Sequence, residues 1–161
     1  MGRLLAIDYG EKRVGLAVSD YMQVIATKLT TVSTLDIFSY LKDYMTREEV
    51  DLIVVGNPKR MNNKPSESAK YVSIFVINLI SSFEGLPIYV ADERYTSKIA
   101  FQTIAKSGLK KKKRQEKGLI DTIAAVLILQ DFMKMYKSGT KLCRVDNKTP
   151  EEIKTIMLGT E

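Results

Sequence analysis

The stretch LLAIDYGEKRVGLAVSD, residues 4–20, decides the fold of this chain. A short apolar strand leads to Asp8, a charged turn follows, and a second apolar strand ends at Asp20. Asp8 is the unusual residue, because a carboxylate at the end of a buried strand loses hydration and needs a cation or several hydrogen-bond donors. Gly10 has no side chain, so another group can approach the backbone. The stretch therefore indicates either a metal or phosphate site, or an Asp8 that caps its own turn.

Composition restricts the chemistry that the chain can perform. Its 161 residues fit one domain, and they include no histidine and a single cysteine. This excludes a histidine general base, a Ser-His-Asp triad, a Cys-His pair and the usual zinc sites. An enzyme with this sequence must rely on carboxylates and oxygen-bound metal ions. No apolar run is long enough to cross a bilayer, and Asp8 stands where a signal peptide would be apolar, so we expect a cytoplasmic protein with no membrane partner.

The positive charge is concentrated in one segment. Residues 106–117 contain seven cations and one anion, which accounts for the whole formal charge of +6. A basic segment on an otherwise neutral chain is typical of a protein that binds a polyanion. The alternative is a solvated lysine loop with no ligand.

The order of apolar runs predicts an α/β fold. Strands are expected at 4–7, 14–20, 23–32, 51–56 and 86–91, and helices at about 35–45, 65–83, 96–108 and 119–136. We expect a mixed five-stranded sheet, a three-strand antiparallel meander plus two parallel strands, flanked by helices. The chain divides into a domain at 1–137 and a tail at 138–161, where Thr149-Pro150 and Glu152 form a capping box that starts a short helix.

Acidic residues follow several of these elements at one predicted edge. Asp8 ends the first strand, Asp92 and Glu93 follow the last, and Asp121 begins the long apolar helix. Ligands in open α/β sheets bind beyond the carboxyl ends of the strands, so the topology can bring these acids together. Each also has a structural interpretation: Asp121 suits a helix N-terminus, and Asp92 or Glu93 can pair with Arg94.

Clustered carboxylates repel one another, and divalent ions that prefer oxygen ligands, Mg²⁺ or Mn²⁺, relieve that repulsion. Two such ions about 3.5–4 Å apart can activate water and stabilise the leaving oxygen of a phosphodiester. The basic segment, with Lys110, Lys111, Lys112, Lys113 and Arg114, then holds the nucleic-acid backbone.

Four blocks carry a family resemblance: DYGEKRVGLAVSD, VVGNPKRMN, VADERYTS and EKGLIDTIAAVLILQD. In this order they resemble the YqgF-type family of pre-16S rRNA nucleases related to Holliday-junction resolvases, over about residues 4–136. The resemblance implies an RNase H-like fold and a metal-dependent endonuclease that trims the 5′ end of pre-16S rRNA in the cytoplasm. It implies that the acidic triad is Asp8, Glu93 and Asp121, and that these residues bind metal. The sequence departs from the family at Asn62-Asn63-Lys64, where Asp-Gly is common, and in the tail.

The nucleic-acid contacts expected beside the triad come from Gly10, Arg13, Lys59, Arg60 and Arg94. Three alternatives stay open: a resolvase acting on branched DNA, which requires a dimer, a non-catalytic RNA-binding assembly factor, and an actin-like or sugar-kinase ATPase. The last is disfavoured by Glu11 after Gly10 and by the short chain. The sequence leaves open whether the chain is a monomer or a homodimer.

Overall fold

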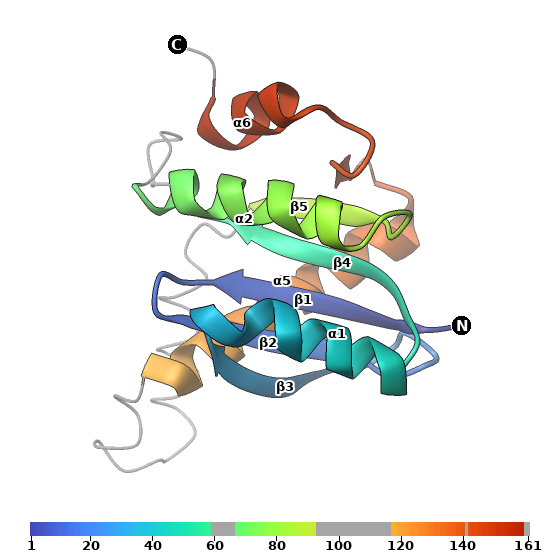
Figure 1. The fold of residues 1–161 in the computed structure, drawn as a ribbon. Coiled ribbons are helices and arrows are strands. Elements are labelled where there is room, and N and C mark those ends of the chain that lie inside the picture. Colours follow the sequence, from blue (N-terminus) through green and yellow to red (C-terminus); the bar gives the residue numbers. More distant parts are fainter. Residues whose placement is uncertain (59–66, 93–116, 141, 160–161) are drawn as a thin grey trace.

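The computed structural model describes residues 1–58, 67–92, 117–140 and 142–159, except for the side chains of 117–122. Most of the basic segment and the helix predicted at 96–108 therefore lie outside the described residues. Within them, one mixed sheet forms the centre of the molecule (Figure 1).

The predicted meander and parallel pair are both confirmed. Strands β1 (Arg3–Tyr9), β2 (Arg13–Ser19) and β3 (Ala26–Ser33) pair antiparallel in sequence order. Strand β4 (Val50–Asn57) pairs parallel with β1, and β5 (Ile88–Asp92) pairs parallel with β4. The carboxyl ends of β1, β4 and β5 therefore lie at the same edge of the sheet.

Helices cover both faces of the sheet (Figure 1). Helix α1 (Ile37–Arg47), preceded by the 3₁₀ turn η1 (Thr34–Asp36), and helix α2 (Ser68–Ser82) lie on one face, and α5 (Lys117–Ser138) crosses the other. Ser33 caps η1 through its side chain, which accepts from the Leu35 N–H. No helix in the described ranges is long and apolar enough to cross a membrane.

Alternation along the strands divides the core into two layers. Leu5 and Ile7 of β1 pack in the cluster beneath α1 and α2, whereas Leu4 and Ala6 pack in the cluster beneath α5. This division follows from the two-residue period of a strand, which directs successive side chains to opposite faces. Both faces of the central strands are buried, which explains their continuous apolar runs.

The tail adds a strand that no sequence pattern predicts. The sheet has six strands rather than five within the described residues, because β6 (Cys143–Arg144) pairs antiparallel with the outer side of β5. Helix α6 (Pro150–Leu158) has the predicted capping box at Thr149 and packs against α2. A two-residue strand has no hydrophobic period of its own, so only its partner strand can specify it.

The connection between β2 and β3 is longer than predicted, since β3 begins at Ala26 and not at residue 23. The Asp20 carboxylate explains the difference, because it accepts hydrogen bonds from the backbone N–H groups of Val24 and Ile25, both at 2.8 Å. These bonds occupy donors that a strand would use for pairing. Residues 20–25 therefore form a turn.

Candidate active site at the carboxyl edge of the sheet

Asp8 lies at the carboxyl edge of the sheet, one residue before the end of β1. It pairs with Gly15 of β2 and is half-buried. Because Leu4 and Ala6 face α5, the strand period places Asp8 on the α5 face as well. The predicted position at a strand end is thus confirmed, and the carboxylate belongs to the face that α5 covers.

The turn after Asp8 is built around Gly10. The Gly10 N–H donates to the Arg13 carbonyl oxygen at 2.9 Å, and Thr34 Oγ1 donates to the Gly10 carbonyl oxygen at 2.7 Å. A Cβ on Gly10 would lie 2.6 Å from the Arg13 oxygen, closer than real Cβ atoms come to such atoms. The glycine is therefore required by the turn itself, and its contact with a phosphate stays a prediction.

Asp121 belongs to α5, about one turn from the start of the helix. In Figure 1 the first turns of α5 lie at the side of the sheet toward which the arrow of β1 points. Residues of α5 from Ala125 onward pack with Leu4 and Ala6, so the helix that carries Asp121 covers the face of the sheet to which Asp8 belongs. The side chain of Asp121 is outside the described part of the structure.

Glu93 is the residue after Asp92, the last residue of β5, and lies outside the described residues. Asp92 is exposed and pairs in register with Asn57 of β4. It also lines a groove of about 540 Å³ between β5 and α5, together with Asp131 and Lys134. The strand that leads to Glu93 therefore ends at the same sheet edge that holds Asp8.

Asn57 is a further polar residue at this edge, beyond those predicted from the sequence. Its side chain is only 3% exposed, and its Oδ1 atom is buried with no hydrogen-bond partner among the described residues. The strand period places it with Ile53 and Val55 on the α2 face, opposite Asp8. The available signal was the same as for Asp8, a polar residue that ends an apolar strand.

The other predicted contact residues divide by location. Arg13 begins β2, directly after the Gly10 turn, and is half-buried. Burial and the charge of Glu11 raise the pKa of the neighbouring Tyr9, whose ring stacks on Phe75 at 4.3 Å between centroids. The remaining predicted contacts lie outside the described residues: Lys59, Arg60, Arg94, Lys110–Lys113 and Arg114.

The donors at this edge suit hard divalent ions. Asp8 and Asp92 offer carboxylate oxygens, which Mg²⁺ and Mn²⁺ prefer as ligands, whereas the Asn57 amide lies on the opposite face from Asp8. Among the described residues, no three acidic or cysteine side chains come together as a metal site. Of the three predicted metal ligands, Asp8 alone has its side chain in the described part of the chain.

Comparison with known proteins agrees with the sequence blocks. Residues 2–135 match the family model RuvX, described as Holliday junction resolvase. A protein of Flavobacterium johnsoniae named "Putative pre-16S rRNA nuclease" is 50% identical over 133 residues, which cover 83% of this chain and 96% of that protein. A protein of Parabacteroides distasonis with the same name is 50% identical over 137 residues, which cover 85% of this chain and 98% of that protein.

Solved structures give the same fold. T. thermophilus RuvC in complex with a Holliday junction substrate aligns with a TM-score of 0.54 at 15% identity, and the alignment covers 90% of this chain and all of that one. A second RuvC structure from Thermus thermophilus aligns with a TM-score of 0.51 at 18% identity, and the alignment covers 89% of this chain and 99% of that one. At these identities the likeness shows the RuvC-type, RNase H-like fold.

Proposed function

This chain belongs to the RuvX family, which confirms the resemblance of its four sequence blocks, and we propose that it is a metal-dependent endonuclease that trims the 5′ end of pre-16S rRNA. The observation that carries the proposal is the half-buried Asp8 at the carboxyl edge, on the face covered by α5. Relatives about 50% identical over most of their length are named as nucleases for this RNA. We assign the activity to residues 1–137 and propose that the protein works in the cytoplasm.

Three carboxylates, Asp8, Glu93 and Asp121, would hold Mg²⁺ or Mn²⁺, with two ions as the expected number. When bound, these ions supply activation of the attacking water and neutralisation of charge on the leaving oxygen. Asp8 is suited to this role because β1 and the Thr34-supported turn fix its backbone, so little is lost in ordering it when the ion binds.

Binding of the RNA backbone is assigned to cations around this edge. Arg13 follows the Gly10 turn, and Lys59, Arg60 and Arg94 follow the ends of β4 and β5 in the sequence. The basic segment at 106–117 leads directly into α5. Such contacts supply affinity that is independent of sequence and depends on salt, which suits a structured precursor.

The test is cleavage of a 5′-extended pre-16S rRNA fragment and of a four-way DNA junction, each with Mg²⁺, Mn²⁺ or EDTA. We expect the RNA to be cut only with a divalent ion, and Asp8→Asn to abolish cutting and to weaken Mn²⁺ binding measured by titration calorimetry. Asp43→Asn is the matched control, because Asp43 is an exposed acid on α1 paired with Arg47. Cleavage that persists in Asp8→Asn rejects the assignment.

The same assay separates the second candidate, a resolvase acting on branched DNA. The family description and the RuvC-type fold favour testing it. Symmetric cutting of the junction, without cutting of the RNA, would identify the resolvase. RNA binding that weakens with salt, without any cutting, would identify a non-catalytic assembly factor.

A further inference from the structure

The turn between β2 and β3 presents large apolar side chains to solvent. Met22 is 69% exposed, and Val24 and Ile25 are each 60% exposed. Scattered apolar residues are normal on a protein surface, but three within four consecutive positions form a patch, and such patches mark interaction sites. This turn lies at the opposite edge of the sheet from Asp8, since it follows the end of β2, which runs antiparallel to β1.

The patch is held in one conformation by hydrogen bonds of Asp20 and Gln23. Asp20 accepts from the N–H groups of Val24 and Ile25, and Gln23, which has a positive φ of 57°, donates from Nε2 to the Gly2 carbonyl oxygen and to Asp51 Oδ2, both at 2.8 Å. Hydrogen bonds from the Ile25 and Val24 N–H groups lower the pKa of Asp20, because they stabilise its charged form. A preorganised apolar surface loses little entropy when it binds a partner.

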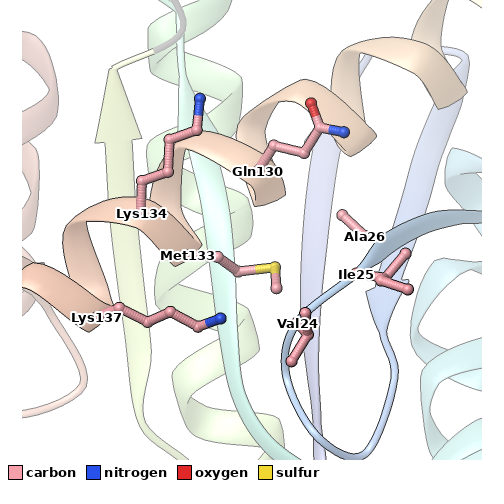
Figure 2. Close-up of a pocket in the computed structure, with 7 residues that line it drawn as sticks. All are labelled: Val24, Ile25, Ala26, Gln130, Met133, Lys134 and Lys137. Carbon is pink, nitrogen blue, oxygen red and sulfur yellow. The ribbon is translucent and has the colours of Figure 1, made fainter.

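A groove of about 470 Å³ separates this turn from the C-terminal half of α5. Its walls are apolar at Val24, Ile25 and Ala26 on one side and at Met133 on the other. Figure 2 shows Met133 and Lys137 extending from α5 toward Val24 and Ile25, whereas the Lys134 side chain points away from that turn. The groove thus combines an apolar centre with cationic margins.

The charged residues of α5 differ between the two grooves. Lys137 lines only the β3-side groove, Lys134 lines both grooves, and Asp131 lines only the groove on the β5 side. Among the described residues that line the β3-side groove, none is acidic. An occupant with carboxylates is therefore favoured electrostatically, and one with cations is disfavoured.

We propose that this groove binds a protein segment that places large apolar side chains in the groove and carboxylates against Lys134 and Lys137. Phosphates of a nucleic acid would satisfy the two lysines but would leave Met22, Val24 and Ile25 facing water, so a peptide accounts for both halves of the surface. The site is separate from the nuclease edge and stands whether or not the proposed cleavage is correct.

The experiment uses a phage-displayed library of random 12-residue peptides, selected on the full chain and counter-selected on Lys134→Glu/Lys137→Glu. We expect enriched peptides to combine Leu, Phe or Trp with Asp or Glu. In solution, the best peptide should shift the NMR amide signals of residues 22–26 and 130–137. The affinity for this peptide should fall by about tenfold or more in each of two double variants, Val24→Ser/Ile25→Ser and Lys134→Glu/Lys137→Glu. The double variant Lys70→Glu/Lys154→Glu, at exposed positions on α2 and α6, is the charge-matched control and should bind normally.

Four results would overturn the proposal. The first is enrichment of peptides without acidic residues, and the second is no binding at 1 mM peptide, about the weakest affinity of interest. The third is that a structured RNA, rather than the peptide, shifts these signals and loses affinity in Lys134→Glu/Lys137→Glu, which would make the groove a nucleic-acid path. The fourth is a dimer in sedimentation that Val24→Ser/Ile25→Ser dissociates, which would make a second copy of the chain the occupant.

Discussion

Thr34 Oγ1 donates a hydrogen bond to the Gly10 carbonyl oxygen at 2.7 Å, so the segment that begins η1 supports the turn following Asp8. The Thr34 N–H also donates to the Lys12 carbonyl oxygen at 3.0 Å. Two bonds from one residue thus fix the loop between β1 and β2 from the side of β3. The position of the candidate metal ligand therefore depends on a residue that is remote in sequence and carries no charge.

Loss of this support should reduce both stability and cleavage. Thr34→Val keeps the shape of the side chain but removes the donor, so we expect the free energy of unfolding to fall by about 1 kcal/mol. Thr34→Ser keeps the hydroxyl and should retain most of the free energy of unfolding. Urea unfolding measures the change in stability, and kcat/KM on the RNA fragment measures the change in cleavage. Equal stability of the Val and Ser variants would show that the bond is unimportant.

Gly10 should tolerate no side chain. In Gly10→Ala the new Cβ would lie 2.6 Å from the Arg13 carbonyl oxygen, so the turn must shift. We expect a larger loss of cleavage than of stability, because the shift displaces the backbone next to Asp8 while the core stays intact. Cleavage rates and thermal unfolding of the same preparation check this. Gly85→Ala, at a glycine with no described atom within 4 Å of its Cβ position but a φ of +84°, should affect stability alone.

The buried amide of Asn57 should reduce stability. Its Oδ1 has no partner among the described residues, and leaving such an acceptor buried costs about 1–3 kcal/mol. We therefore expect Asn57→Leu to raise the free energy of unfolding by about 1 kcal/mol in urea titrations. Asn57→Asp should do the opposite at neutral pH, because it buries a charge. A destabilised Leu variant would show that the amide makes a contact required for folding.

Asp146 should make the attachment of the tail sensitive to acid. Its carboxylate accepts from Arg144 at 2.8 and 3.0 Å and from the Ile88 N–H at 3.0 Å, and these bonds lower the pKa of Asp146, with Arg144 the largest cause. A lowered folded-state pKa means that the stabilisation is present above the unfolded value of about 3.9 and is lost as the pH falls through the folded value.

We accordingly expect Asp146→Ala to unfold more easily than the parent chain at pH 7, by about 1 kcal/mol. The difference should shrink as the pH is lowered below about 4, because protonation then removes the same interaction from the parent chain. Urea unfolding across this pH range measures it. Glu84→Ala, at an exposed position after α2, is the control. A difference that stays constant with pH would mean that packing, and not the charge, is responsible.

The basic segment should determine the salt dependence of RNA binding. Replacing Lys110–Lys113 with serine removes four charges, and each phosphate that the protein no longer neutralises should reduce the slope of log K against log salt by about 0.7–0.9. Binding titrations between about 50 and about 200 mM salt would measure the slope. An unchanged slope would show that the segment is a solvated lysine loop that does not contact the RNA.

Local patterns were sufficient to predict the central sheet but not its margins. The apolar runs of β1 and β4 are buried on both faces, so their composition alone identifies them. β6 has two residues, and its pairing depends on β5 and on the bond from the Ile88 N–H to Asp146, which are 58 positions apart. No short sequence window contains that information.

The candidate site shows the same limit. Asp8 was recognisable because a carboxylate contradicts its apolar surroundings, and its place at the strand end is confirmed. Thr34 and Asn57 were missed because threonine is ordinary before a helix and asparagine is ordinary after a strand. Thr34 matters because it donates a hydrogen bond to Gly10, 24 positions away. Asn57 matters because its buried Oδ1 atom has no hydrogen-bond partner among the described residues.

The segment after α5 determines when the hydrophobic core can close during synthesis of the chain. Val145, Ile153 and Met157 are among the buried residues of the core beneath α1 and α2, and β6 covers the outer edge of β5. Because synthesis proceeds from the N-terminus, these residues leave the ribosome after every strand that they cover. Until they do, the nascent chain exposes an open strand edge and an unfilled apolar face. The arrival of this segment, rather than the folding of the meander, therefore closes the core and removes a target for chaperones and aggregation.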